Sequence, residues 1–194
     1  MSALRAFIAI SLPKPIQQKL DEVIRLLKNE KTGAVRWVSA NNIHLTLKFL
    51  GEVDGAKVEA ISQVIQAESQ HIHPFELSAS GVGAFPNLRR PRVIWVGVQA
   101  PQALIDLANA IDQGTQRLGF QGEERAFSPH LTLGRLSQNA SLQEMQSVAQ
   151  ALSAARISNL GSFTVTQVTL FRSDLQSSGA VHTPLFTASL NTLG

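Results

Sequence analysis

The sequence predicts a fold of two similar lobes, each built from strands and helices in the same order. The chain of 194 residues is 44% hydrophobic and 16% charged, which is typical of a globular protein that buries a sizeable core. Strand and helix patterns follow one another as β-α-β-α-β, and the second half repeats that order. Glycines and prolines interrupt regular structure near 81–91, which places the boundary between the lobes close to 86–91.

The first half contains five expected elements: a strand at 5–11, a helix at 15–29, a strand within 36–51, a helix at 56–70 and a strand at 75–84. The first strand is short and apolar, and Pro13 ends it. Pro15 falls in the first turn of the helix, a position that tolerates proline. Each helix has one apolar face, formed in the first helix by Ile16, Leu20, Val23, Ile24 and Leu27.

The second half repeats the order: a strand at 92–98, a helix at 101–118, a strand within 127–136, a helix at 141–155, a strand at 163–172 and a last strand at 184–190. The helix at 101–118 has one apolar face, formed by Leu104, Leu107, Ala108 and Ile111. We therefore expect a single domain over 1–194, with an N-terminal half of about 1–88 and a C-terminal half of about 89–194, between which strands can be exchanged.

The third segment of each half carries the same tetrapeptide, HLTL, which begins at His44 and again at His130. The chain has only 5 histidines, so two such repeats arise from this composition with a chance of roughly one in 10⁵. In a strand, side chains alternate between faces, so each histidine shares a face with its threonine, Thr46 or Thr132, while the leucines occupy the other. The leucines can then pack into a core while both His-Thr pairs face a shared cleft.

Two histidines and two hydroxyls suit the opening of a cyclic phosphodiester. That reaction needs a base to deprotonate the attacking water and an acid to protonate the leaving sugar oxygen. The ordinary pKa of histidine, near 6.5, lets one ring be neutral while the other is protonated. The threonine hydroxyls can donate hydrogen bonds to the non-bridging phosphate oxygens. This scheme requires no metal and no cofactor, and the sequence offers no compact cluster of acidic residues for magnesium.

The chain resembles the RNA 2′,3′-cyclic phosphodiesterases, also called the LigT-like or 2′-5′ RNA ligase family, within the two-histidine (2H) phosphoesterase superfamily. The matching text is RAFIAISLP, NNIHLTLKFLGEV, RPRVIWVGV and FSPHLTLGRL, in this order along nearly the whole chain. The resemblance implies an α+β, bilobal fold in which antiparallel sheets face a central cleft and helices lie outside. It also implies hydrolysis of 2′,3′-cyclic phosphate ends to 2′-phosphates, together with reversible 2′-5′ joining of tRNA halves.

By the same resemblance, His44 is the general acid, His130 is the general base, and both threonines bind phosphate. The near-symmetry of the two motifs gives no local reason to prefer this assignment of acid and base. The resemblance also makes Arg135 a phosphate ligand. Strict alternation puts Arg135 on the leucine face, but a bulge at Gly134 could turn it back.

Three weaker candidates complete the substrate-binding set. Lys48 lies on the His44 face by alternation, where it could meet an RNA phosphate, and the alternative, a surface lysine without a role, is favoured. Phe49 and Phe127 could stack on a base, with packing in the core as the alternative for Phe49. His182 stands alone in a polar segment and is given no role. Ser128 lacks partners that would make it a nucleophile.

Composition excludes several other classes of protein. There are no cysteines, so disulfides, thiolate metal sites and cysteine nucleophiles are ruled out. The net charge of +3 and a sequence isoelectric point of about 9.7 are compatible with a polyanionic partner. We expect a cytoplasmic monomer that acts on RNA, with no signal peptide and no membrane span. Two alternatives stay open: a non-catalytic RNA- or nucleotide-binding module, and a phosphodiesterase for a small cyclic nucleotide.

Overall fold

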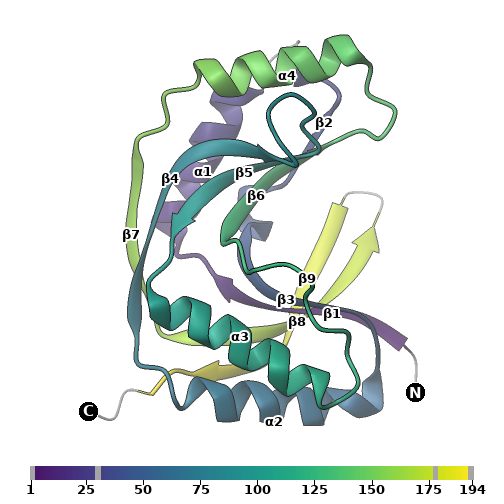
Figure 1. The fold of residues 1–194 in the computed structure, drawn as a ribbon, viewed down its shortest axis with the longest axis vertical. Helices are drawn as coiled ribbons and strands as arrows, with labels where there is room; N and C mark the ends of the chain where they lie inside the picture. Colours follow the sequence, from purple (N-terminus) through teal and green to yellow (C-terminus); the bar gives the residue numbers. More distant parts are fainter. Residues whose placement is uncertain (1–2, 29–31, 177–178, 192–194) are drawn as a thin grey trace.

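The computed structural model describes residues 3–28, 32–176 and 179–191 (Figure 1). The helices there are α1 (Lys14–Leu27), α2 (Val58–Ser69), α3 (Gln102–Gln116) and α4 (Leu142–Ala154), with short 3-10 turns η2 (Ala40–Asn42) and η3 (Gly55–Lys57). The strands are β1 (Ala3–Ser11), β2 (Val35–Trp37), β3 (His44–Asp54), β4 (Phe75–Phe85), β5 (Val93–Gln99), β6 (His130–Leu136), β7 (Asn159–Val165), β8 (Gln167–Gln176) and β9 (Gly179–Ser189).

All of these strands form one curved antiparallel sheet. Its order is β7-β4-β5-β6-β3-β1-β8-β9, and β2 pairs with β6. Helices α1 and α4 lie towards one end of the molecule and α2 and α3 towards the other (Figure 1). The expected α+β bilobal fold, with antiparallel strands and outer helices, is confirmed. The strands that carry the two histidine motifs, β3 and β6, are direct neighbours in this sheet rather than members of separate sheets.

Each lobe draws strands from both halves of the chain. The β6 lobe contains β7, β4, β5 and β6, and the β3 lobe contains β3, β1, β8 and β9. The last strand of the first half, β4, pairs with β5 of the second half. In return, β8 near the end of the chain pairs with β1 at its start. The sequence repeat is therefore exchanged between the lobes and does not divide the molecule into two consecutive units.

Two expected boundaries are wrong. Phe85 of β4 pairs with Val93 of β5, so the segment at 86–92 is the turn of a hairpin inside the β6 lobe and not a lobe boundary. Glycine and proline mark a chain reversal without showing what it connects. The single strand expected at 163–172 is two strands, β7 and β8, which lie far apart in the sheet order, with β7 at one end and β8 next to the other end. Nothing in the apolar pattern of this segment signals the break between them.

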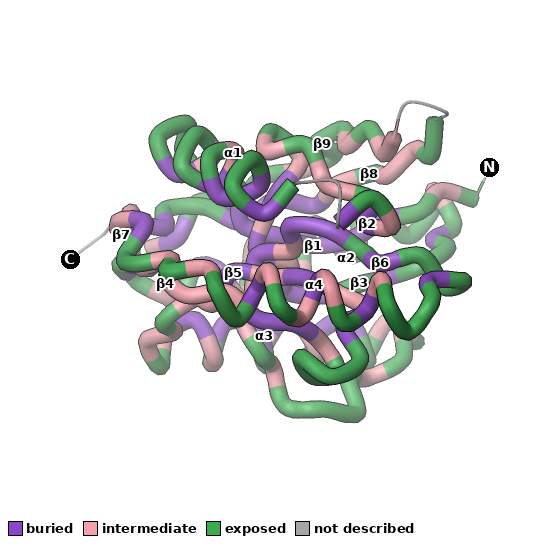
Figure 2. Tube along the Cα trace, turned by 90° about the horizontal axis from the view of Figure 1, so that it is seen from above, coloured by how far each residue is buried: buried purple, intermediate pink, exposed green. Residues whose placement is uncertain are grey.

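The helices form where the apolar pattern predicts them. The buried residues of α1 are the five expected from its periodicity. Helix α4 begins with a capping box, in which Ser141 and Glu144 exchange hydrogen bonds. Buried positions concentrate in the central strands, and the outer faces of the helices are exposed (Figure 2). None of the helices in the described ranges is long and apolar enough to cross a membrane.

The motif leucines pack in a single hydrophobic core that spans both lobes. Leu131 is fully buried at the junction of the lobes, whereas Leu142 is 74% exposed on α4. We expect Leu131→Ala to lower the free energy of unfolding by about 2–4 kcal/mol, because it leaves a cavity in a closely packed region. Leu142→Ala should change it by less than about 0.5 kcal/mol. Urea denaturation of both variants measures this, and equal effects would contradict the placement of the core.

Candidate active site

The two histidine motifs meet at one cross-strand pair. Leu45 of β3 lies opposite Leu131 of β6 in antiparallel register. Opposite residues in an antiparallel pair share a face, and side chains alternate along each strand. The histidine and threonine of each motif therefore lie on the face away from the core, and all four are half-buried, whereas the leucines are buried. This register places His44 beside Thr132, and Thr46 beside His130.

Each histidine is anchored in the same way. The Nδ1 atom of His44 lies 2.8 Å from the carbonyl oxygen of Asn42, and that of His130 lies 2.7 Å from the carbonyl oxygen of Ser128. A carbonyl oxygen only accepts, so Nδ1–H is the donor in both bonds. The other nitrogen of each ring, Nε2, is left to accept a proton when neutral or to donate one when charged. The two rings thus have equivalent tautomers, fixed by the residue two positions earlier.

Aromatic side chains hold both rings. Phe7 stacks on His44 with 4.5 Å between ring centroids and 21° between planes. His182 meets the same ring, His44, edge-on at 5.3 Å. Phe85 meets His130 edge-on at 4.9 Å. These contacts leave each imidazole little rotational freedom, so the direction of Nε2 is set before any ligand binds.

Burial lowers the pKa of His44 from 6.5 to about 4. The hydrogen bond to the Asn42 carbonyl opposes this effect, and the neighbouring His182 adds to it. Burial also lowers the pKa of His182 itself. At pH 7 the rings of His44 and His182 are therefore both neutral.

A bulge in each strand changes the face of the residues that follow the motif. In β3 the register with β1 shifts by one residue at Leu47, and in β6 the register with β5 shifts at Leu133. Phe49 then falls on the histidine face, where it is 60% exposed. Arg135, five residues after His130 as Phe49 is after His44, falls on the same face and is exposed. The bulge considered for Arg135 is present, and Phe49 is not a core residue.

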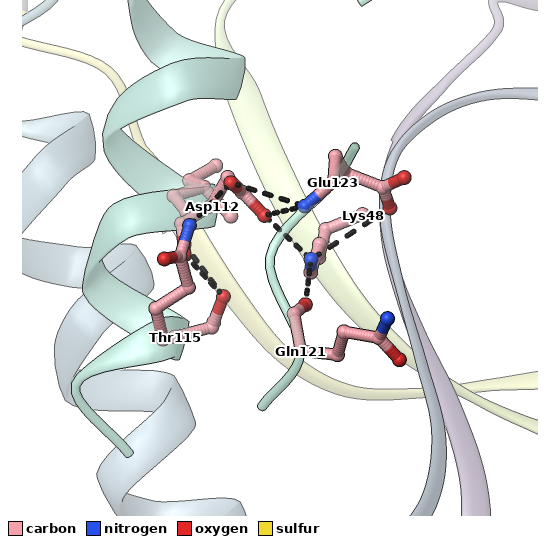
Figure 3. Close-up of polar contacts among 7 residues, drawn as sticks. Lys48, Asp112, Thr115, Gln121 and Glu123 are labelled. Carbon is pink, nitrogen blue, oxygen red and sulfur yellow. Dashed lines mark hydrogen bonds and ion pairs between the residues drawn. The ribbon is translucent and has the colours of Figure 1, made fainter. Parts of the chain in front are cut away.

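The placement of Lys48 on the His44 face is wrong, because the bulge at Leu47 turns its side chain towards the core. Lys48 is only 2% exposed, and its Nζ forms an ion pair with Asp112 of α3 at 2.5 Å (Figure 3). Its remaining contacts are with the segment that follows α3. A lysine held in this way cannot serve as a free phosphate ligand.

A cavity of about 510 Å³ opens beside Thr46 and His130. Its walls come from β3, from α3 and from the segment 123–128, which includes Phe127. Phe49 also lines it, so the two aromatic residues predicted to contact the substrate border the same space. The volume is within the range that holds small organic ligands.

Several residues that shape the site escape sequence reasoning. Asn42 and Ser128 act through backbone carbonyls, which every residue type offers, so their side chains give no signal. Asp112 becomes relevant only because α3 brings it to Lys48. His182, which was given no role, lies against His44 because β8 and β9 fold back beside β1. Its Nδ1 is buried without a hydrogen-bond partner.

Comparison with known proteins shows which protein family this chain is similar to. The family model described as "LigT like Phosphoesterase" matches twice, over residues 10–95 and 96–182, so each match contains one histidine motif. An RNA 2′,3′-cyclic phosphodiesterase of Methanothermobacter thermautotrophicus is 33% identical over 182 residues, covering 94% of this chain and 96% of the relative. The RNA 2′,3′-cyclic phosphodiesterase of Escherichia coli is 32% identical over 182 residues, covering 93% of each.

Solved structures agree with these sequence matches. Escherichia coli LigT complexed with 3′-AMP is 31% identical and superposes with a TM-score of 0.77, covering 98% of this chain and all of that one. TT0787 of Thermus thermophilus is 27% identical with a TM-score of 0.80, covering 97% of this chain and 98% of that one.

The low pKa of His44 makes stability depend on pH. Unfolded His44 takes up a proton near pH 6.5, but the folded protein resists it down to about pH 4. The neutral ring therefore contributes stability above pH 6.5 that is lost as the pH falls through this range. Between pH 7.5 and 4.5 we expect wild type to lose about 2–3 kcal/mol more than His44→Gln in urea denaturation. The exposed His73 is the control, and His73→Gln should behave as wild type.

Proposed function

The chain belongs to the LigT-like phosphoesterase family, and we propose that it hydrolyses RNA 2′,3′-cyclic phosphate ends to 2′-phosphates with His44 and His130 as the acid–base pair. The single observation that supports this most is the arrangement at the Leu45–Leu131 pair. Two imidazoles, each with Nδ1 anchored to a carbonyl and Nε2 available, lie on one face of adjacent strands beside two threonines. The shared activity named for the relatives supports the substrate.

The reaction needs two proton transfers on opposite sides of phosphorus. One imidazole takes a proton from water as the water oxygen attacks phosphorus. The bond between phosphorus and the 3′ oxygen breaks, and the other imidazole gives that oxygen a proton. The products are a 2′-phosphate and a free 3′-hydroxyl. Thr46 and Thr132 donate hydrogen bonds to the non-bridging oxygens, whose negative charge grows in the transition state.

We assign the acid role to His44 and the base role to His130, following the pattern of the family. The pKa of about 4 means that only about one His44 in 10³ carries a proton at pH 7 in the empty cleft. A bound phosphodiester brings a negative charge next to the ring, and such a charge raises a pKa by about 1–3 units. The substrate itself thereby supplies the condition under which His44 becomes protonated.

No metal takes part in this scheme. Across the described ranges there is no group of three or more histidine or acidic residues arranged to hold a metal ion. Phosphate charge is instead met by the threonines, by the imidazolium and by Arg135 on the same face. We propose tRNA halves as one source of cyclic ends, and action as a cytoplasmic monomer. If the 5′-hydroxyl of a second RNA replaced water, the same bond exchange would form a 2′-5′ linkage.

We expect His44→Ala and His130→Ala each to lower kcat by about 10²–10⁴, because each removes one proton transfer. Thr46→Ala and Thr132→Ala should lose about 10–10³-fold. The assay measures conversion of a short RNA with a 2′,3′-cyclic phosphate end to the 2′-phosphate, with excess chelator present. His73→Ala is the matched control and should retain full turnover.

Chelator-sensitive turnover would contradict metal independence. Near-normal turnover in either motif-histidine variant would falsify the acid–base pair. A folded wild type that converts no RNA at any pH would favour a small cyclic nucleotide as substrate, or a binding role.

A substrate with sulfur in place of the 3′ bridging oxygen separates the acid from the base. A thiolate leaves without a proton far more readily than an alkoxide does, because the pKa of a thiol is only about 8.5. If His44 is the acid, this substrate should restore most of the activity lost in His44→Ala and little of that lost in His130→Ala. The initial rates of both variants on both substrates measure this. Restoration in His130→Ala alone would reverse the assignment.

A further inference from the structure

Lys48 is a charged side chain held almost entirely out of water. Its ammonium group contacts Asp112 at 2.5 Å, the carbonyl oxygen of Gln121 at 2.6 Å and Oε1 of Glu123 at 3.7 Å (Figure 3). A buried ammonium without partners is costly, whereas here it has three oxygen atoms from α3 and from the segment that follows it. One side chain from β3 thus joins the strand of the first motif to the segment that leads into the second.

Asp112, the ion-pair partner of Lys48, accepts hydrogen bonds from several groups. Besides Lys48 it accepts from Nε2 of Gln116 at 2.6 Å and from the backbone N–H of Glu123, at 3.2 and 3.4 Å to its two oxygens. Burial alone would raise the pKa of Asp112, but the bonds from Lys48 and Gln116 outweigh it and hold the pKa below its ordinary value. The carboxylate of Asp112 therefore stays ionised at neutral pH, and the contacts of Lys48 and Asp112 fix the backbone at 121–123 from two directions.

The equivalent place in the other motif is built differently. Gly134, four residues after His130 as Lys48 is after His44, pairs with Trp37 of β2. A Cβ atom at Gly134 would lie 2.8 Å from Val35 and 3.2 Å from the carbonyl oxygen of Arg36, so β2 can approach only because no side chain is present. The segment before β3 is thus held to β6 by a main-chain ladder. The segment before β6 is held to β3 by the Lys48–Asp112 pair.

The segment 121–129 has no helix or strand of its own to support it. It provides one wall of the cavity beside Thr46, and it carries Ser128, whose carbonyl accepts from Nδ1 of His130. Only four residues lie between Glu123 and Ser128, so fixing one restricts the other.

We propose that Lys48 and Asp112 are positioning residues that hold the segment 121–129 and thereby fix the Nδ1–H bond of His130. The role in catalysis rests on the proposed function, whereas the effect on the His130 ring does not. The partner motif offers an internal comparison, since Nδ1 of His44 bonds to Asn42, which has no part in this network.

The test uses Lys48→Met and Asp112→Asn in the full chain, with ¹⁵N-histidine labelling. We expect the Nδ1–H signal of His130 to exchange with water at least about tenfold faster in both variants, while that of His44 stays as in wild type. The kcat for the cyclic-phosphate RNA should fall about 10–100-fold, with a smaller change in KM. Lys57→Met is the matched control, because Lys57 reaches the carbonyl of Leu118 at the start of the same connection from an exposed position.

An unchanged His130 signal in folded variants overturns the proposal, and so does a parallel loss of both histidine signals, which would mean general unfolding. If both variants fail to fold, the pair is a structural support alone. A faster-exchanging His130 with kcat unchanged would separate the pair from catalysis. A wild type without turnover would remove the proposed function and leave the result on the His130 ring to be judged by itself.

Discussion

One cross-strand pair, Leu45 opposite Leu131, sets the positions of the two histidines and two threonines that we propose as catalytic residues. Burying these two leucines turns the neighbouring histidines and threonines outward, and a slip of one residue would send both histidines into the core. The leucines belong to a single hydrophobic cluster that spans both lobes, so the register is fixed by the same burial that stabilises the fold. Catalytic geometry is in this sense a consequence of core packing.

Beyond the shared leucine pair, the two motifs differ in the residues that follow them. The two ends of the cleft therefore carry different side chains. Equivalent bulges bring Phe49 and Arg135 to equivalent places, one aromatic and one cationic. One position later than each bulge, Lys48 and Gly134 produce opposite results, an ion pair on one side and a main-chain ladder on the other. A symmetric site would bind a nucleotide end equally in two orientations. Under the proposed function, the aromatic ring of Phe49 would favour a base at one end of the site, and the guanidinium of Arg135 would favour a phosphate chain at the other.

The sequence was sufficient to predict the fold class, the apolar faces of the helices and the outward direction of His44 and His130, because these follow from periodicity within short segments. It was not sufficient for the exchange of β4 and β8 between lobes, since strand pairing depends on contacts between distant segments. Lys48 was misplaced because a bulge breaks the two-residue period and leaves no mark in composition. The same kind of bulge places Phe49 and Arg135 on the histidine face instead of the leucine face, which favours a role for both in binding.

The lowered pKa of His44 bears directly on the proposed reaction. Burial against Phe7 and His182 keeps His44 neutral, which spares the protein an unpaired charge on the inner face of the sheet. The same low-polarity surroundings strengthen the attraction between the ring and a bound phosphodiester. In the proposed mechanism, a ring that resists protonation when alone but accepts a proton beside an anion becomes the acid at the point where the leaving oxygen needs a proton. The stacking that orients the imidazole and the burial that lowers its pKa therefore come from the same contacts, and neither can be relaxed without the other.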